Sequence, residues 1–433
     1  MTDDVMSRDA LARVLTGLVD YSVLDAQEAD GELVVTVIAT ATSAPCPGCG
    51  EFSSHVKSVR SQIVRDVSHA GRGVRLVVHK RSFRCVASGC ERRSFTPHTD
   101  EVPARCRVTT RCRELIGRAG KDRSTASVAR EFHVSWSTAW KAIKTVAVRE
   151  LDARAAVVLP AVIGLDETRF WWRVPWLTGI VDITSSDLID MTVGRTATTV
   201  TDWLSGLSEA QRAAITTVVI DPHAGYRAAI ITALPHAVIV GDRFHFELLT
   251  GRALTDVRRR RIWEQQAHRG RRTDPGWRAR HDLLRQPDRL SERGWKRVIT
   301  AMRADAGEPI EGDLLWAWAA RQYFREIYTT ATSRAHAHRM LIWWYCWIAT
   351  HPVPELVRLA TTISTWENEF LAYFDRRVTN GPTEGRNRTI KHVKRLGYGY
   401  RNTTNYILKC RYRALRVTSW TTPAQRAPTA PNA

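Results

Sequence analysis

The stretch Val157-Val-Leu-Pro-Ala-Val-Ile-Gly-Leu-Asp166 is an apolar run that ends on a carboxylate. A second apolar run, Ile215-Thr-Thr-Val-Val-Ile220, is followed directly by Asp221. Short apolar runs of this kind are typical of strands buried inside a sheet. A single aspartate after a strand is most simply a solvated side chain. The repetition of the pattern favours two carboxylates that a sheet holds rigidly at the ends of its strands.

The segments around these two runs predict the rest of the sheet. Trp171–Val181 and Leu188–Thr192 are strand-like and flank a turn at Thr184–Asp187, whereas Ala237–Val240 follows a short helix at Gly225–Leu234. The predicted order is three strands, an optional helix, a fourth strand, a second helix and a fifth strand. This is the order of an RNase H-like α/β sheet.

A third carboxylate, Glu384, lies far downstream in a segment that starts a helix at Asn380-Gly-Pro382. Glu384 is the only acidic residue from Arg376 to the C-terminus. It is therefore either an ion-pair partner in a basic stretch or the third member of a carboxylate set. Three converging carboxylates can hold two divalent cations, Mg²⁺ or Mn²⁺, about 4 Å apart for in-line attack at phosphorus. A period of 3.6 residues puts DNA-directed groups on the same face of this helix: Asn387, Arg388, Lys391 and Lys394 or Arg395.

Four of the eight cysteines form two pairs, Cys46-Pro-Gly-Cys49 and Cys85-Val-Ala-Ser-Gly-Cys90. Two such pairs can close a tetrahedral structural Zn²⁺ site. Short strands at Gln62–Val67 and Val74–His79 between the pairs suit a zinc-ribbon-like module. Unrelated cysteines or a redox CxxC are the alternatives, and the regular pairing without a sign of export favours zinc.

Residues 108–150 have the pattern of a helix-turn-helix. One helix ends at Gly120, a second carries Val128, Ala129 and Phe132, and a break at His133–Val134 precedes Ser135 as an N-cap. The next helix has Trp136, Ala139, Trp140 and Ile143 on its apolar side. An ordinary helical hairpin is the alternative, but the basic charge favours DNA in the major groove. The outward-facing side chains of this helix would contact DNA: Ser137, Thr138, Lys141 and Lys144.

The charge distribution supports a polyanionic partner. The chain has 433 residues and a net charge of +20, with a hydrophobic fraction of 44% that excludes disorder throughout. Residues 46–150 and residues 376–433 each carry +12, whereas residues 151–250 carry −4. Basic flanks of this strength favour nucleic acid. No apolar run is long enough to span a bilayer, and the acidic start MTDDVMSRDALARV is unlike a secretory signal.

In their order along the chain these motifs resemble bacterial insertion-sequence transposases of the DDE type, and more narrowly the IS-L-three family. The most specific pieces are Asp242-Arg-Phe-His245, Thr379-Asn-Gly-Pro-Thr-Glu384-Gly-Arg-Asn387 and Lys394-Arg-Leu-Gly-Tyr-Gly-Tyr-Arg-Asn402. Ile163-Gly-Leu-Asp166-Glu167 and Asp221-Pro-His-Ala-Gly-Tyr226 also match, although Pro222 stands where the family often has Met.

The resemblance implies a catalytic triad of Asp166, Asp221 and Glu384 and a helical insertion between the second and third members. Asp242 and His245 match a family motif and would support the active site or contact DNA, and His223 is a further candidate for support. Glu167 would point to the opposite face of its strand and is a weaker metal ligand. The implied partners are double-stranded DNA, at transposon ends and at the target, and further copies of the chain, in the bacterial cytoplasm at the nucleoid.

The expected organisation is a multidomain α+β protein. It comprises an N-terminal segment (1–45), the zinc module (46–104), the helix-turn-helix (105–150), the first part of an RNase H-like core (157–249), an all-helical insertion (250–375), the last core helix (376–418) and a disordered tail (419–433). Within the insertion, Arg258–Arg261 is either a solvated helix surface or a phosphate-contacting patch. Core packing is predicted for five tryptophans of this region, and stacking of one of them on a displaced DNA base is the alternative: Trp316, Trp318, Trp343, Trp344 and Trp347. Trp171, Trp172 and Trp176 are predicted to be sheet residues packed under the active site.

Three functions remain open on these grounds. A transposase cuts and joins DNA, a DNA-binding regulator would leave the three carboxylates unexplained, and a nuclease on the same fold would hydrolyse DNA without joining it. The amino-terminal modules and the family resemblance favour the transposase, because such an enzyme must recognise its own end sequences before it cuts.

Overall fold

The computed structural model describes residues 17–155, 159–170 and 176–415. It consists of an amino-terminal unit, residues 1–156 with 392–413, and a central unit, residues 157–391 with 414–433. The boundary falls inside helix α15 (Gly381–Leu396). Trp171 and Trp172 lie outside the described residues. Among the helices that are described, none is long and apolar enough to cross a membrane.

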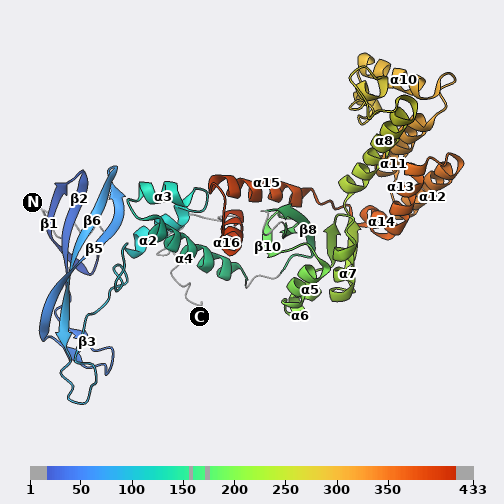
Figure 1. The fold of residues 1–433 in the computed structure, drawn as a ribbon. Helices are drawn as coiled ribbons and strands as arrows, with labels where there is room; N and C mark the ends of the chain where they lie inside the picture. Colours follow the sequence, from blue (N-terminus) through green and yellow to red (C-terminus); the bar gives the residue numbers. More distant parts are fainter. Residues whose placement is uncertain (1–16, 156–158, 171–175, 416–433) are drawn as a thin grey trace, which may run out of the picture. The chain divides into compact units, whose positions relative to one another are not determined.

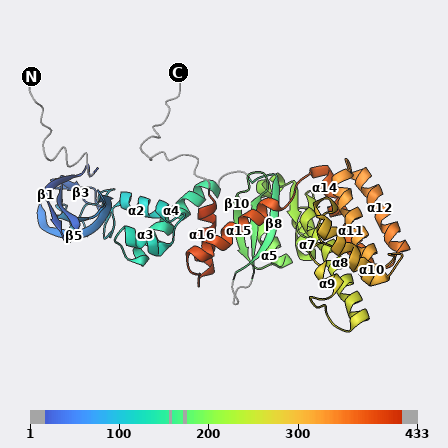
Figure 2. The ribbon, with the colours of Figure 1, turned by 90° about the horizontal axis from the view of Figure 1, so that it is seen from above.

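The amino-terminal unit begins with a sheet of strand order β1-β2-β6-β5, with β7 paired to β6 (Figures 1 and 2). β2 pairs in parallel with β6, so the sheet joins residues on both sides of position 45. Asp30-Gly31 and Ala70-Gly71, all with positive φ, form two-residue turns that match the twist of antiparallel strands. The strands are β1 (Tyr21–Ala29), β2 (Glu32–Ala39), β5 (Val56–His69), β6 (Arg72–Arg84) and β7 (Ser94–Phe95).

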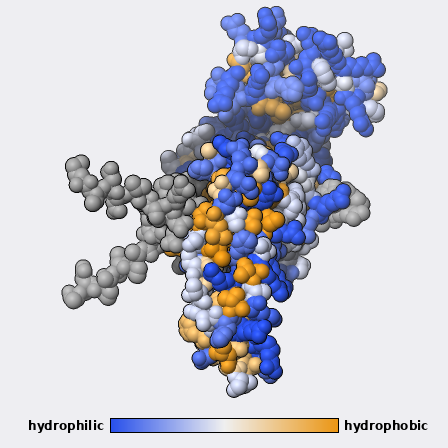
Figure 3. Space-filling view, turned by 90° about the vertical axis from the view of Figure 1, so that its left-hand side faces the viewer, coloured by the Kyte–Doolittle hydropathy of each residue, from blue (hydrophilic) through white to orange (hydrophobic). Residues whose placement is uncertain are grey.

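The two faces of this sheet differ. Alternate residues such as Val37, Leu76 and Val78 are fully buried in one cluster with Leu18 and Val102. On the other face Ile63 of β5 is 65% exposed, and Figure 3 shows apolar side chains gathered on this part of the unit. At the far end, the short strands β3 (Ala44–Pro45) and β4 (Phe52–Ser53) carry the first cysteine pair between them.

Four helices follow in this unit: α2 (Thr110–Ala119), α3 (Thr125–Glu131), α4 (Trp136–Ala155) and, from the end of the chain, α16 (Thr403–Ala414). Gly117 and Gly120 allow α2 to lie close to α4, because a Cβ on either would fall within 2.5 Å of Val146 or Ile143. Tyr412 of α16 donates a hydrogen bond from its hydroxyl to the carbonyl of Gly117, 3.1 Å away.

The turn between α3 and α4 has the predicted construction. His133 adopts a left-handed φ of 52°, and the Ser135 hydroxyl accepts a hydrogen bond from the backbone N–H of Thr138 at 3.2 Å. Ala139 and Ile143 are buried as predicted. Trp136 was predicted on the apolar side but is 54% exposed and stacks on Trp140 at the surface, because it lies in the first turn of α4.

The central unit contains a sheet of order β10-β9-β8-β11-β12. β8, β9 and β10 are antiparallel neighbours, and β11 and β12 run parallel to β8. The predicted strand and helix order is therefore present. The strands are β8 (Val162–Arg169), β9 (Trp176–Asp182), β10 (Leu188–Val193), β11 (Thr217–Ile220) and β12 (Val238–Gly241). The helices between them are α5 (Ala197–Ser205), α6 (Glu209–Ala214) and α7 (Ala224–Ala233).

A long helical segment separates β12 from α15 (Figure 1). It packs into the same apolar core as the sheet, since Ile163 and Val240 of the strands and Phe324 and Phe370 of the helices belong to one buried cluster. The elements are α8 (Arg243–Gln266), α9 (Pro275–Arg278), η1 (Pro287–Arg289), α10 (Glu292–Ala306), α11 (Asp313–Thr330), α12 (Arg334–Thr350), α13 (Pro354–Thr365) and α14 (Glu367–Arg376).

The tryptophans of this segment pack as predicted with one exception. Trp344 is fully buried and donates from Nε1 to the carbonyl of Ala320 at 2.9 Å. Trp316, Trp318 and Trp347 are partly buried against the core. Trp343 is 53% exposed, because it lies one residue around the helix from Trp344, and its ring makes a T-shaped contact with Tyr323.

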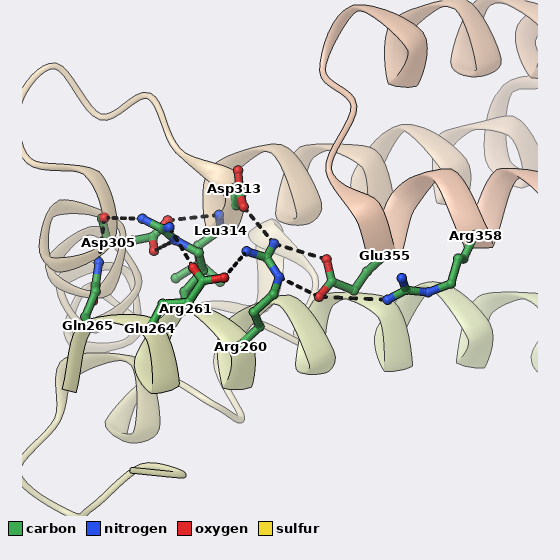
Figure 4. Close-up of polar contacts among 9 residues, drawn as sticks. All are labelled: Arg260, Arg261, Glu264, Gln265, Asp305, Asp313, Leu314, Glu355 and Arg358. Carbon is green, nitrogen blue, oxygen red and sulfur yellow. Dashed lines mark hydrogen bonds and ion pairs between the residues drawn. The ribbon is translucent and has the colours of Figure 1, made fainter. Parts of the chain in front are cut away.

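The run Arg258–Arg261 on α8 divides between two environments. Arg260 and Arg261 are internal ion-pair residues that tie α8 to neighbouring helices (Figure 4). Arg260 binds Glu355 at 2.7 Å and Asp313 at 2.7 Å. Arg258 is 6% exposed, whereas Arg259 lies at the surface. Neither a uniformly solvated surface nor a uniform phosphate-contacting patch therefore describes this run.

Candidate metal centres and DNA-binding surface

The four predicted zinc ligands meet at one point in the amino-terminal unit. The Sγ atoms of Cys46 and Cys90 are 3.9 Å apart and those of Cys49 and Cys85 are 3.6 Å apart, and all four lie within 4.8 Å of one another. Sulfurs bound tetrahedrally at 2.3 Å would be separated by about 3.8 Å. Hydrogen bonds from the backbone, chiefly at Gly48, lower the pKa of the Cys46 thiol to about 7. The donor set therefore fits a structural zinc ion.

The surface of α4 presents the predicted DNA-directed side chains. Ser137, Lys141 and Lys144 are exposed and Thr138 is half-buried. The opposite face of α4 is buried through Ala142, Ile143 and Val146. A helix with this division can lie in a major groove while its apolar face packs on the rest of the unit.

Asp166 and Asp221 occupy neighbouring positions in the central sheet. β8 and β11 pair in parallel up to Leu165 and Ile220, so each aspartate is the first residue after that ladder. Asp221 follows its strand as predicted. Asp166 does not end its strand, because β8 continues to Arg169 through antiparallel pairing with β9. Asp166 therefore lies inside a regular strand, with β8 continuing before and after it.

The surroundings of Asp166, including the charge of Asp221, disfavour its ionised form. Burial, and then the negative charge of Asp221, raise the pKa of Asp166 to about 7. Across the site, His245 Nδ1 lies 2.9 Å from Asp221 Oδ1 and 3.0 Å from Asp242 Oδ2. Burial alone would lower the pKa of His245, but these two hydrogen bonds raise it to about 10. Asp221, Asp242 and His245 also form a group whose ligand atoms lie within 4.8 Å of one another.

Two amide side chains tie the segment around Glu384 to these aspartates. Asn387 of α15 donates from Nδ2 to Asp166 Oδ2 at 2.6 Å. Asn380 donates from Nδ2 to Asp221 Oδ1 at 3.3 Å, and its backbone N–H donates to Asp242 Oδ1 at 2.9 Å. Asn380 and Asn387 are 5% and 6% exposed. Asn387 was predicted among the DNA-directed groups, but here it faces a carboxylate inside the unit.

A glycine in β8 permits this close approach. A Cβ at Gly164 would lie 2.5 Å from Thr383 Oγ1 and 2.6 Å from Asn380 Oδ1. Gly164 and Asp166 are two residues apart and so face the same side of the sheet, where α15 lies. Ile163 and Leu165 face the other side and are buried with residues of α5 and α7. Arg386 further fastens α15 by binding Asp187, 3.3 Å away.

Glu384 itself lies in the first turn of α15, one turn before Asn387. Its side chain is 58% exposed and pairs with Arg388 at 3.0 Å. It is not part of the Asp221, Asp242 and His245 group. Lys391 and Arg395 are exposed on the same helix, and Lys394 is half-buried.

The remaining predicted site residues have structural roles. His223 caps α7 by accepting a hydrogen bond at Nδ1 from the N–H of Tyr226 at 3.2 Å. Glu167 lies 3.8 Å from Arg195, on the strand face opposite Asp166. Sequence reasoning took Asn380 only as part of a helix start. Asn380 in fact contacts Asp221 and Asp242. Its position in a family motif, four residues before Glu384, is the signal that could have indicated this role.

A family model described as transposase matches residues 163–410, which include both aspartates, the helical segment and α15. The chain belongs to the transposase family ISL3 (IS-L-three). Two further models match segments of this transposase before residue 163. One is the zinc-finger of transposases IS204, IS1001, IS1096 and IS1165, over residues 42–90, and the other is the helix-turn-helix domain of the ISL3 family, over residues 97–147.

Curated relatives agree with this membership. The transposase for insertion sequence element IS1001 of Bordetella parapertussis is 26% identical over 373 residues, which cover 84% of this transposase and 87% of the relative. The transposase for insertion sequence element IS1557 of Mycobacterium tuberculosis is 26% identical over 263 residues, or 55% and 57% of the two chains. The match over residues 163–410 excludes a protein made only of DNA-binding modules.

Proposed function

We propose that this transposase binds the ends of its own insertion sequence and cuts and joins DNA strands at a carboxylate centre made of Asp166, Asp221 and Glu384. The observation that carries the proposal is the 2.6 Å hydrogen bond from Asn387 to Asp166. Because Asn387 is one helical turn from Glu384, this bond brings the helix of the third carboxylate onto the strand of the first.

The residues around this centre suit divalent cations such as Mg²⁺ or Mn²⁺. The donor set is rich in carboxylate oxygen, which such cations prefer. Burial and the charge of Asp221 make ionised Asp166 unfavourable unless a cation is near. Asn380 Oδ1 is buried without a hydrogen-bond partner. Two bound divalent cations would activate the attacking oxygen and neutralise charge on the leaving oxygen.

The protein's own contribution is to fix these ligands in advance. β8 and β11 hold Asp166 and Asp221 side by side, and Asn387 and Asn380 orient their carboxylates. His245 contacts the carboxylate of Asp221 and is itself oriented by Asp242. Glu384 completes the set when its side chain leaves Arg388, which would then be free to bind a DNA phosphate.

The sheet order and its interruption by α8–α14, between β12 and α15, favour an RNase H-like core with a helical insertion. The four cysteines would hold structural Zn²⁺ and so stabilise the module beside the helix-turn-helix. The exposed groups of α4 would read end DNA. Cutting and joining two ends in concert further implies a homo-oligomer on DNA.

The test uses the DNA that flanks the gene. Fragments from either side are incubated with the full chain and Mg²⁺, and the products are resolved for cleavage and for joining to a second duplex. We expect both products and their loss in Asp221→Asn. Cleavage without any joined product would favour the nuclease, and no cleavage of either fragment by folded, zinc-loaded protein would contradict the proposal.

A further inference from the structure

A concave surface of about 640 Å³ lies on α8 and the loop that follows it, within the central unit. Five arginines and two tryptophans line it, and no acidic side chain does. This composition is unusual for a surface that has no ligand, because clustered guanidinium groups repel one another. A neighbouring cavity along α8 differs, since Glu247 and Asp256 line it.

Arg258 is the residue that most needs a partner in this cavity. Its side chain belongs to a residue that is 6% exposed, and its Nη1 is buried without a hydrogen-bond partner. Burial, and then the charges of Arg259 and Arg280, lower its pKa. A buried guanidinium without a counterion costs free energy in the isolated protein. An anion in the cavity would remove that cost.

The other arginines separate into paired and available groups. Arg260 is neutralised by Glu355, Asp313 and Glu264, as Figure 4 shows, and Arg259 lies 3.6 Å from Asp256. Arg269 is exposed. Arg280 donates to the carbonyl of Trp277, 3.0 Å away, and lies over that indole at 3.6 Å. Arg258, Arg269 and Arg280 thus supply the positive charge.

The tryptophans indicate what kind of anion would fit. Trp263 is 56% exposed at the edge of the cavity, where an indole face can stack on a planar base. The Trp277 indole is covered on one side by Arg280. Guanidinium groups beside an exposed indole are the combination that binds the phosphates and bases of a DNA strand.

We infer that this cavity binds a phosphodiester of a DNA strand through Arg258, Arg269 and Arg280, with an adjacent base on Trp263. The inference rests on the proposed function, since it assigns part of the DNA to the helical segment. It adds a DNA-binding surface made of other residues than those of the helix-turn-helix and of the carboxylate centre. On this inference, the buried Arg258 contributes to DNA binding rather than to the stability of the fold.

The experiment measures DNA affinity against salt for the full, zinc-loaded chain in an Asp221→Asn background without cleavage. The probes are a duplex of about 30 base pairs of arbitrary sequence and its separate single strand, between about 50 and 200 mM salt. The variants are Arg258→Met, Arg269→Met and Trp263→Ala. Arg289→Met, exposed on η1 and outside the cavity, makes the same change in charge and is the control.

Each arginine variant should weaken binding by about tenfold and lower the salt slope by about one, whereas Arg289→Met should do neither. Trp263→Ala should weaken binding of the single strand more than that of the duplex. The Arg258→Met protein should have the same or a higher melting temperature than the unmodified protein. If Arg258 served only to stabilise the fold, its replacement would lower the melting temperature. Loss on the duplex, the strand or both supports the inference.

Unchanged affinity and slope for both probes in Arg269→Met and Trp263→Ala would overturn the inference, even if Arg258→Met failed to fold. That result would leave the carboxylate centre untouched, because cleavage by the unmodified active site is measured separately. Conversely, a loss of binding here together with normal cleavage in Asp221→Asn would support this cavity while contradicting the proposed catalytic residues.

Discussion

The cysteine cluster of the amino-terminal unit and the carboxylate cluster of the central unit offer opposite kinds of ligand to a cation. The first has four sulfurs within 4.8 Å and needs no further ligand to complete a tetrahedron. The second has carboxylate oxygens, with the pKa of one carboxylate raised to about 7 and a third carboxylate that is 58% exposed. A metal ion whose ligands are all supplied by the protein suits a structural role. A site with incomplete protein coordination leaves room for DNA and for the reacting oxygens.

The two clusters also differ in the secondary structure that holds their side chains in place. Two-residue strands flank the first cysteine pair, and the second pair lies in a loop after β6, so we expect the metal to supply much of the order there. Regular strands and buried amides, through hydrogen bonds of the protein itself, hold Asp166 and Asp221. The comparison therefore predicts that metal loss affects folding at the first cluster and chemistry at the second.

The largest expected effect comes from neutralising the carboxylates. Asp166→Asn, Asp221→Asn and Glu384→Gln should each reduce cleavage by about a thousandfold or more, because several kcal/mol of charge stabilisation are lost. End binding should change little. Glu167→Gln, on the opposite face of β8, is the matched control and should keep its activity. Cleavage near the unmodified rate in any of the three variants would remove that residue from the triad.

The next effect is expected at the cysteines. Cys46→Ser should release zinc, expose residues 42–90 to protease and weaken end binding, because a zinc module of this size depends on its metal for its fold. Metal content, proteolysis and DNA affinity measure this, with Cys346→Ser as the exposed-cysteine control. Unchanged end affinity after verified zinc loss would mean that the module does not support DNA recognition.

A smaller effect is expected for the amide that orients Asp166. Asn387→Leu keeps the branched shape but removes the donor, and should lower metal affinity or activity about 10- to 100-fold. Asn387→Asp should be worse, because it places a further negative charge beside Asp166. The Mg²⁺ concentration for half-maximal cleavage distinguishes this role from a loss of stability. Equal Mg²⁺ dependence in all three proteins would show that the amide is not needed.

The smallest effect is expected on the recognition helix. Lys141→Ala should weaken binding to end DNA by about tenfold and lower the salt slope by about one if the lysine contacts a phosphate. Lys296→Ala, an exposed lysine on α10, is the control. If both variants bind alike, α4 does not lie against the DNA.

The sequence predicted those features that depend on local patterns. Ser135 and Gly120 mark the helix boundaries around the helix-turn-helix, and the apolar runs before Asp166 and Asp221 identify the two central strands. The continuation of β8 beyond Asp166 could not be predicted, because it depends on pairing with β9. The parallel pairing of β2 with β6 is likewise a long-range contact without a local signal.

The candidate site shows the same division. Its carboxylates and cysteines could be named from spacing and family motifs, but the direction of a polar side chain could not. Asn387 faces Asp166 rather than solvent, and Arg260 binds carboxylates while its neighbour Arg258 has an unsatisfied nitrogen. Helical period gives the side of the helix on which a residue lies, but only the packing of other elements decides its partners.

The most direct test of the difference between the two clusters is Mn²⁺ binding to the zinc-loaded chain, followed by electron paramagnetic resonance. Mn²⁺ is the probe because it prefers oxygen ligands and because its electron paramagnetic resonance spectrum changes with its coordination. We predict that the full chain binds Mn²⁺, that Asp166→Asn and Asp221→Asn lose most of this binding, and that Cys46→Ser retains it. Unchanged Mn²⁺ binding in both aspartate variants, or its loss in Cys46→Ser alone, would contradict the account.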